Sequence, residues 1–469
     1  MSFYLGIDFG TSGARAIAID MAGEYQAEAR CSFDCSFDRS AASSPPWTFI
    51  WKTALFELLS SLAESVRREI RSIAINGTSS TVLLCDRQGT PAVEPILYND
   101  SRGLEVMQLV GAIAPANHPA LSATSSLAKL LWCLEKLPPS PELSIESLVA
   151  PEKLPLYFLH QADWLSFLLH GIIGVGDYHN TLKLGGDPER LCYPKWLTEA
   201  GFVESPDRDI VKPERIISHS KHILYLPRIV KPGTPVGPVT PKIARQFGLP
   251  SDCIVRAGTT DSIAAFLASG ASEPGEAVTS LGSTLVLKLL SGSRVDNSRY
   301  GIYSHRLEPL SNRLSNIGSN ANAALWLPGG ASNTGGAVLR QFFSDRELTE
   351  LSGQIDPSRE SPLDYYPLIK PGERFPINDP KLLPRLEPRP DNPVEFLHGL
   401  LESMARIEAR GYQLLQELGA TKLVRVYTAG GGTQNPVWTA IRERHLQVPI
   451  VSSVHTEAAY GTALLARYD

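Results

Sequence analysis

Two aspartates and three glycine-rich loops are the residues of this sequence whose types and spacing suit chemistry. Asp8 precedes the turn Gly10-Thr11-Ser12-Gly13, and Asp261 follows Gly-Thr-Thr. The other two loops are Gly282-Ser283-Thr284 and Gly430-Gly431-Gly432, and each of the three adjoins an apolar run. A tight turn explains any one loop equally well, but three loops beside strands favour a shared role.

That shared role is the binding of phosphate. Glycine allows backbone N–H groups to turn toward an anion and to approach it closely. Hydroxyl groups that can also donate to phosphate oxygens belong to Thr11, Ser12, Ser283 and Thr284. We expect the loops at 10–13 and 282–284 to hold the phosphates of a nucleotide from opposite walls, and bare backbone at 430–432 to contact its base or sugar. Because the loops match neither GxxxxGK[ST] nor GxGxxG, a P-loop NTPase and a dinucleotide oxidoreductase are disfavoured.

The two acids suggest a metal and a base. A carboxylate at position 8 would repel phosphate unless a cation lay between them, so Asp8 is interpreted as an anchor for Mg²⁺, reached through water. Asp261 begins an expected helix after a strand and a Gly-Thr-Thr turn, which is typical of a helix cap. It could equally accept a proton from an attacking hydroxyl in phosphoryl transfer, and one residue can serve in both roles. We expect the two carboxylates to face each other across one nucleotide-filled gap.

Alternating strands and helices must position these residues. The runs at 3–10 and 14–20 predict a hairpin, and 275–290 predicts a second hairpin that repeats its pattern. Strands flank the Gly-Thr-Ser-Ser of 72–86, and 226–241 is rich in Pro and Gly, as a connector is. Helical spacing occurs at 48–70, 125–137, 161–173 and, rich in alanine and suited to close packing, 456–469. The alternation predicts an α/β protein, and the repeated hairpin suggests duplicated domains with a cleft between them.

Composition narrows the class of protein. The length of 469 residues favours two domains. A net charge of -5 argues against a nucleic-acid partner. We expect no signal peptide and no membrane span, because no basic segment precedes a long apolar run at the start and no run approaches 18 apolar residues. The six cysteines form no CxxC pair and are expected to be reduced thiols of a cytoplasmic protein.

The motifs, taken in order, resemble those of the FGGY carbohydrate kinases, of the actin/hexokinase/Hsp70-like superfamily. The resemblance lies in "GIDFGTSGARA", "GTTDSIAAF", "SLGST" and "TAGGGTQNPVW" and runs over nearly the whole chain. "SSLAKLLWCLEK" resembles the family's first signature, with Lys129 and Trp132 in place and Cys133 where an aliphatic residue is usual. "DYHNTLKLGG" and "FLHGLLESMARIEA" are similar to further segments of the family.

The resemblance implies an α/β fold of two RNase-H-like domains flanking a deep cleft. Residues 1–256 would bind the sugar, and residues 257–469 would bind ATP, with the last helix able to pack on the first domain. Asp261 matches the catalytic base, and Asp8 matches the metal-associated acid beside the substrate. The adenosine side would include Gly430, Gly431, Gly432, Asn435 and Trp438. For Trp438, core packing is the alternative to flanking the base.

The sugar is expected to be an open-chain ketose. Typical xylulokinases have a Met-His or Gln-His-Gly element where this chain has "INGTSSTV", and residues 76–81 contain no His. Ser79 offers a hydroxyl there instead. "YNDSRG" adds Asp100 and Arg102 as sugar-binding candidates, although a surface turn with an ion pair explains them too. The pattern is most similar to the plant and cyanobacterial xylulokinase-like subgroup, whose members act as D-ribulose kinases.

The resulting expectation is ATP- and Mg²⁺-dependent phosphorylation of the terminal hydroxyl of D-ribulose, with Asp261 as base. A D-xylulose kinase or a weakly active sugar-sensing ATPase of the same fold remains an alternative. A chaperone or filament ATPase is disfavoured, because such proteins lack the Gly-Thr-Thr-Asp acid and no residues are left over for a peptide-binding region. The expected partners are ATP and a small ketose, without nucleic acid or membrane, and the protein is a monomer or a homodimer.

Overall fold

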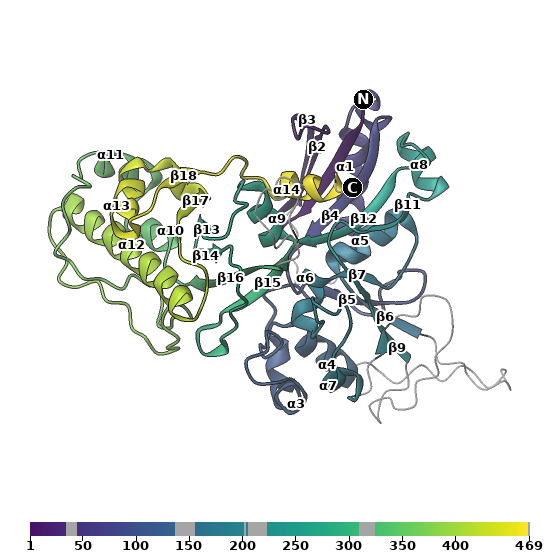
Figure 1. The fold of residues 1–469 in the computed structure, drawn as a ribbon, viewed down its shortest axis with the longest axis horizontal. Helices are drawn as coiled ribbons and strands as arrows, with labels where there is room; N and C mark the ends of the chain where they lie inside the picture. The colour runs from purple at the N-terminus through teal and green to yellow at the C-terminus, as the bar shows by residue number, and fades with distance from the viewer. Residues whose placement is uncertain (34–44, 137–154, 201–202, 205–222, 309–323, 468–469) are drawn as a thin grey trace. The chain divides into compact units, whose positions relative to one another are not determined.

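The computed structural model divides the chain into two compact units. It describes residues 1–33, 45–136, 155–200, 203–204, 223–308 and 324–467. The first unit comprises Met1–Ala268 and Glu457–Asp469, and the second comprises Ser269–Thr456 (Figure 1). The chain therefore leaves the first unit after residue 268 and returns to it at residue 457. The boundary expected at 256/257 falls inside a strand of the first unit.

A six-stranded sheet forms the centre of the first unit, in the order β11-β12-β4-β1-β2-β3. Its strands are β1 (Phe3–Phe9), β2 (Gly13–Ile19), β3 (Tyr25–Ser32), β4 (Ile70–Gly77), β11 (Pro235–Pro238) and β12 (Ile254–Thr260). β1, β4 and β12 run parallel, whereas β2, β3 and β11 are joined antiparallel. The first predicted hairpin is therefore confirmed as β1–β2.

Helix α14 (Ala458–Ala466) packs directly on this sheet and on helix α9 (Asp261–Ala268) (Figure 1). Gly6 on β1 permits this approach, because a Cβ there would lie 2.1 Å from the carbonyl oxygen of Ala459. Gly461 of α14 has the same function against α9, where its Cβ would lie 1.9 Å from the oxygen of Ala264. The alanine-rich composition that predicted close packing thus brings residues 458–466 onto the first unit.

The rest of the first unit covers the central sheet and extends from it. A smaller sheet has the order β5-β6-β9-β8, and a two-stranded sheet pairs β10 with β7. These strands are β5 (Val82–Cys85), β6 (Pro155–His160), β7 (Val175–Asp177), β8 (Val203–Glu204), β9 (Ile223–Leu226) and β10 (Arg228–Val230). The remaining α-helices are α1 (Trp47–Ser61), α2 (Glu64–Arg67), α3 (Met107–Ile113), α4 (Ser126–Lys136), α5 (Gln161–His170), α6 (Tyr178–Thr181), α7 (Lys195–Thr198) and α8 (Pro241–Phe247).

The second unit repeats the arrangement of five of the six strands of the first unit's sheet. Its sheet has the order β15-β16-β14-β13-β17-β18. The strands are β13 (Glu276–Leu281), β14 (Leu285–Leu289), β15 (Tyr303–Leu307), β16 (Leu325–Ser332), β17 (Arg425–Ala429) and β18 (Ile450–Ser452). β13 pairs antiparallel with β14 and parallel with β17, as β1 pairs with β2 and β4. The second predicted hairpin is therefore confirmed, and the shared topology agrees with an internal duplication.

The core of the second unit lies between this sheet and its helices. They are α10 (Gly336–Phe342), α11 (Asp345–Ser352), α12 (Pro393–Glu417) and α13 (Pro436–Leu446). α12 contributes a long buried face that includes Leu397, Leu400 and Met404, and it packs against α11 and α13 (Figure 1). Burial of apolar area between the helices and one face of the sheet stabilises such a layer.

Three local predictions were wrong. The helix expected over 48–70 is broken at Leu62, which is extended and buried, and Arg67 caps the end of α1 by donating to the carbonyls of residues 59, 60 and 62. The expected Gly-Thr-Thr turn is the irregular end of β12, where Gly258 passes so close to β4 that a Cβ would lie 1.7 Å from the oxygen of Ile75. The expected connector at 226–241 contains β10 and β11. As an edge strand, β11 tolerates its prolines.

Other sequence features can be followed only in the described residues. No helix among them has the length and apolar character that crossing a membrane requires. Their five cysteines, at 31, 85, 133, 192 and 253, are free thiols. Cys35 and most of the segment 31–47, for which the sequence suggested a surface excursion, lie outside the described residues.

Candidate active site

The carboxyl ends of three parallel strands bring polar residues to one edge of the first unit's sheet. β4 lies between β1 and β12, and Asn76 on β4 is in register with Asp8 on β1 and with Thr259 on β12. Asp261 follows two residues after Thr259, at the start of α9. Ligands of open α/β sheets bind at the carboxyl ends of the strands, so this edge is the candidate active site.

A negative charge on Asp8 is destabilising in the folded protein, because the carboxyl group is buried. Burial is the largest cause that raises the pKa of its carboxyl group, to about 7, and the nearby charge of Asp261 raises it further. A hydrogen bond from Asn76 and the charge of Arg15 oppose this rise. Oδ1 of Asp8 is shielded from solvent and has no hydrogen-bond partner among the described residues. An ionised Asp8 therefore lacks the compensation that a cation would supply.

Asp261 lies close to Asp8, as the electrostatic effect between them requires. It is the first residue of α9, is half-buried, and accepts a hydrogen bond at Oδ1 from the backbone N–H of Ser262 at 2.6 Å. The structure thus brings together the two acids singled out in the sequence, within one unit. Asp261 lies at the start of α9, a position that is compatible both with the helix-cap interpretation and with a role as base.

The site fits a magnesium ion of the kind that accompanies nucleotide phosphates. In the described residues no three His, Cys, Asp or Glu side chains form a metal-binding group. Mg²⁺ commonly keeps several waters and binds one or two carboxylates together with substrate phosphates. Asp8, with a shielded and unpartnered Oδ1, is the residue suited to that arrangement, and Asp261 is the second carboxylate nearby.

The loop Gly10–Gly13 adjoins Asp8 as the turn of the β1–β2 hairpin. Gly10 donates from its backbone N–H to the carbonyl of Gly13 at 3.0 Å. Thr11 and Ser12 at the tip are exposed, and the Ser12 carbonyl accepts from the N–H of Phe33. The hydroxyls predicted to contact phosphate are therefore accessible, three and four residues after Asp8.

The turn Thr78–Thr81 leaves the same sheet edge at the end of β4. Within this turn, the backbone N–H of Thr81 donates to the carbonyl of Thr78 at 3.2 Å. Ser79 is half-buried, whereas Ser80 is buried, has φ +65°, and carries a shielded hydroxyl without a partner among the described residues. A serine in this left-handed conformation is uncommon, and such backbone strain concentrates at functional sites.

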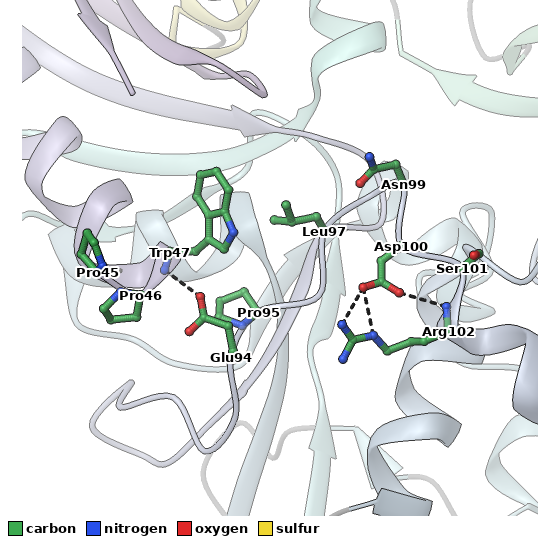
Figure 2. Close-up of a pocket in the computed structure, with 10 residues that line it drawn as sticks. All are labelled: Pro45, Pro46, Trp47, Glu94, Pro95, Leu97, Asn99, Asp100, Ser101 and Arg102. Atoms are coloured by element: carbon green, nitrogen blue, oxygen red, sulfur yellow. Dashed lines mark hydrogen bonds and ion pairs between the residues drawn. The ribbon is translucent and has the colours of Figure 1, made fainter. Parts of the chain in front are cut away.

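Asp100 and Arg102 line a pocket of about 630 Å³ in the first unit (Figure 2). Arg102 donates to Asp100 Oδ2 through Nε at 3.0 Å and through its terminal nitrogen at 2.6 Å. The guanidinium also stacks over the ring of Trp132, 4.6 Å from its centroid. The ion pair that was the alternative explanation is therefore present, and it faces a pocket whose opposite side contains Trp47 and Glu94.

The two loops predicted in the second unit adjoin each other. Gly430 follows β17 with φ +86°, and a Cβ there would lie 2.7 Å from the carbonyl oxygen of Leu281 and 3.3 Å from the N atom of Gly282. The carbonyl of Gly282 accepts from Gly336 at the start of α10. Ser283 is exposed and Thr284 half-buried. The loops 282–284 and 430–432 thus lie side by side.

Asn435 and Trp438 have clear packing roles in the second unit. The Asn435 side chain caps α13 by accepting from the N–H of Trp438 at 3.0 Å, and it donates to Ser352 Oγ at 2.8 Å. Trp438 is 3% exposed and belongs to the core, where its ring lies against Gly432. Core packing, the alternative interpretation of Trp438, accounts for its position. The Trp438 ring therefore packs against Gly432 of the loop.

Sequence reasoning missed residues that complete the site. Asn76 donates from Nδ2 to Thr462 Oγ1 of α14 at 2.6 Å, and both are buried. Asn76, like Asp8, is a polar residue near the end of an apolar run, and this pattern could have identified it. No local signal indicates Thr462, which lies 386 positions away along the chain. Lys129 and Gln161, which hold the turn Thr78–Thr81, were also missed as site residues.

Comparison with known proteins places this geometry in a family. The model of the FGGY family of carbohydrate kinases matches with its N-terminal domain over residues 3–175 and with its C-terminal domain over residues 307–469. Together the two matches cover more than half of the chain.

Relatives of similar length are named as sugar kinases. Xylulose kinase of Staphylococcus epidermidis is 22% identical over 99% of this chain and 87% of its own length. L-fuculokinase of Salmonella typhi is 23% identical over 99% of this chain and 92% of its own. The structure of xylulose kinase from Lactobacillus acidophilus superposes with a TM-score of 0.76 at 16% identity, over 100% of this chain and 89% of that one.

The superposition confirms the predicted α/β fold of the actin/hexokinase type, with mixed sheets in two domains. The matches to both domain models agree with the motifs in the sequence and with the paired acids at the sheet edge. The chain belongs to the FGGY family of carbohydrate kinases.

Proposed function

We propose that this protein transfers the terminal phosphoryl group of ATP to the terminal hydroxyl of a ketopentose, with D-ribulose as the preferred acceptor. The observation that carries the proposal is the pair Asp8 and Asp261, which lie close together at the carboxyl ends of β1 and β12. Phosphoryl transfer needs a carboxylate that orients the attacking hydroxyl and a second group that holds the metal near the phosphates.

Asp261 acts as the base. Its carboxylate accepts the proton of the sugar hydroxyl as the hydroxyl oxygen bonds to the γ-phosphorus and the bond from that phosphorus to the β–γ bridging oxygen breaks, which releases ADP. The hydrogen bond from Ser262 fixes the rotamer of Asp261. Mg²⁺ would neutralise charge on the phosphates, and Asp8 is the residue that would hold it. Exposed Thr11 and Ser12 donate to the transferring group.

The nucleotide and the sugar are held by different loops. Backbone N–H groups of 282–284 and 430–432 would contact ATP, because bare glycine backbone permits a close approach. The turn Thr78–Thr81 and the pair Asp100–Arg102 would contact the sugar. Ser79, which is half-buried and so accessible in part, supports this assignment.

D-Ribulose and D-xylulose are the two candidate acceptors. The absence of His from residues 76–81 supports D-ribulose, because the turn offers small hydroxyls in its place. The names of the relatives from Staphylococcus epidermidis and Lactobacillus acidophilus support D-xylulose as the second candidate. The two sugars differ in configuration at a single carbon, so one altered side chain in the pocket can decide between them.

An ADP-release assay with a panel of acceptors tests the proposal. D-Ribulose, D-xylulose, L-ribulose, sedoheptulose and glycerol are compared at fixed Mg²⁺–ATP. We expect the highest kcat/KM with D-ribulose. A higher value with D-xylulose would select the second candidate. ADP release without any sugar would indicate an ATPase, and no release at all would indicate a sugar sensor.

The variant Asp261→Asn tests the base. We expect kcat to fall by about 10²–10⁴-fold, the usual contribution of a positioned base, while ATP affinity measured by calorimetry stays within about twofold. Glu273→Gln, on an exposed turn of the second unit, is the matched loss of one carboxylate and should leave kcat unchanged. Normal turnover in Asp261→Asn would remove this residue from the mechanism.

A further inference from the structure

Lys129 is a fully buried lysine on α4 that joins the two segments assigned above to the sugar. Its exposed fraction is 0%, and its Nζ donates to the carbonyl oxygen of Ser80 at 2.7 Å and to that of Leu97 at 2.6 Å. Ser80 belongs to the turn Thr78–Thr81. Leu97 lines the pocket of Figure 2, and its carbonyl also accepts from the N–H of Asp100 at 3.1 Å.

A buried amine is destabilising unless hydrogen bonds compensate for its lost hydration. Burial lowers the pKa of Lys129 to about 7, an effect that Asp100 opposes and that Lys183 and Arg102 reinforce. A neutral amine has two N–H groups and an ammonium has three. Both protonation states can therefore supply the two carbonyls of Ser80 and Leu97, and the contact persists on either side of neutrality.

The same turn is held from a second side by Gln161 at the start of α5. Its Oε1 accepts from the N–H of Thr78 at 3.0 Å and from Thr78 Oγ1 at 3.1 Å. Its backbone N–H donates to the carbonyl of Thr81 at 3.0 Å. With Lys129 on Ser80, every residue of the turn except Ser79 is bonded to a neighbouring helix. The left-handed conformation of Ser80 is thus fixed by the protein itself.

A second network fixes the helix that carries Lys129. Ser126 Oγ on α4 lies 3.0 Å from Nε2 of His160, and Nδ1 of His160 lies 3.1 Å from Oδ2 of Asp163. The order Ser–His–Asp resembles that of a hydrolase, but Ser126 and His160 are 0% exposed, so no substrate can reach the hydroxyl. The network instead ties α4 to α5, and so ties Lys129 to Gln161.

We propose that Lys129 is a positioning residue that holds the segments 78–81 and 97–102 at a fixed separation and thereby sets the affinity for the ketose. This inference rests on the proposed function, which assigns both segments to the sugar. A single amine spans the two segments, so its loss frees both at once. Binding would then require each segment to be ordered by the ligand.

Lys129→Met tests the proposal, because it keeps the length and apolar stem of the side chain and removes the donors. We expect KM for the ketose to rise about tenfold or more, as ordering even one backbone residue at each binding event weakens affinity to that extent. KM for ATP and kcat should stay within about twofold. Lys129→Arg, which keeps the donors, should recover part of the affinity.

Two variants of the same helix serve as controls. Lys136→Met removes an exposed amine that pairs with Glu105, and it should change neither KM nor Tm. Leu131→Ala opens a cavity in the core behind α4, so it should lower Tm without changing KM for the ketose. An unchanged ketose KM in Lys129→Met, or an equal rise in Leu131→Ala, would overturn the positioning role.

Hydrogen exchange separates this inference from the proposed function. If no ketose supports ADP release by the native protein, the proposed function fails by itself. Exchange of the Thr81 and Asp100 amides should still be faster in Lys129→Met than in Lys136→Met, because both amides lie in the segments that the amine holds. If Lys129→Met does not fold, Lys129→Gln, whose shorter side chain cannot reach both carbonyls, is compared in the same way. Exchange rates equal to those of the native protein in both segments would contradict the positioning role of Lys129.

Discussion

Replacing Asp8 by Asn is expected to stabilise the ligand-free protein while destroying its activity. In the folded state the pKa of Asp8 is about 7, against 3.8 for an unhindered carboxyl, chiefly because the group is buried. A raised pKa means that the folded protein binds this proton more tightly than the unfolded chain does. The stability that the proton supplies is complete below about pH 4 and is lost as the pH rises through 7.

The magnitude follows from the two pKa values. At 1.36 kcal/mol per pH unit, keeping Asp8 ionised above pH 8 costs the folded state about 4 kcal/mol, and about 3 kcal/mol of this arises between pH 5 and pH 8. Asparagine is neutral at every pH, so its advantage over aspartate should grow by the same amount. At about 2 °C per kcal/mol for a unit of this size, Tm of Asp8→Asn should gain about 4 to 6 °C on the native protein between these pH values.

Calorimetry of both proteins at pH 5 and pH 8, in EDTA and without nucleotide, measures this difference. Asp252→Asn removes an exposed carboxylate from the turn before β12 and should give a Tm close to the native value at both pH values. Asp261→Asn should weaken the pH dependence of the native protein, because the Asp261 charge helps to raise the pKa of Asp8. A Tm difference between Asp8→Asn and native protein that is the same at pH 5 and pH 8 would contradict a raised pKa of Asp8 in the folded state.

Two further perturbations address the second unit. Gly430→Ala should raise KM for ATP about tenfold with an unchanged ketose KM, because its Cβ would lie 2.7 Å from the Leu281 carbonyl oxygen. Gly292→Ala, at an exposed glycine of the same unit whose Cβ would have its nearest neighbour at 4.0 Å, should change neither KM, and equal values for the two variants would contradict this role for the loop. Glu408→Leu should lower the free energy of unfolding by about 3–5 kcal/mol and Tm by about 10 °C. The substitution leaves the buried Arg442 guanidinium without the carboxylate that it contacts at 2.6 and 2.8 Å. A Tm loss below about 2 °C would show that solvent reaches the guanidinium.

Local patterns predicted the elements whose formation depends on local chemistry. Glycine turns between apolar runs identified the hairpins β1–β2 and β13–β14, and alternation of strands and helices identified the α/β class. The break at Leu62 was missed because the helical periodicity continues across it, and Arg67 stops the helix from outside through side-chain hydrogen bonds.

The candidate site was predictable only in part. Asp8 and Asp261 were recognisable from the loops beside them, and the structure brings them together. The contact of Asn76 with Thr462 depends on the return of the chain to the first unit, which neither residue signals locally. Lys129 was recognised as a residue of the family's first signature, but a lysine within an apolar helical run gives no indication of the two carbonyls it contacts.

The return of α14 to the first unit has a consequence for synthesis on the ribosome. Residues 1–268 leave the exit tunnel long before residues 458–466, yet α14 fills the groove over Gly6 and supplies the Thr462 partner of Asn76. The growing polypeptide must therefore hold an unfinished sheet, with its apolar flank bare, while the whole inserted second unit is translated. Premature termination anywhere before residue 458 would leave that flank bare permanently, and exposed apolar surface of this kind is what chaperones and proteases recognise.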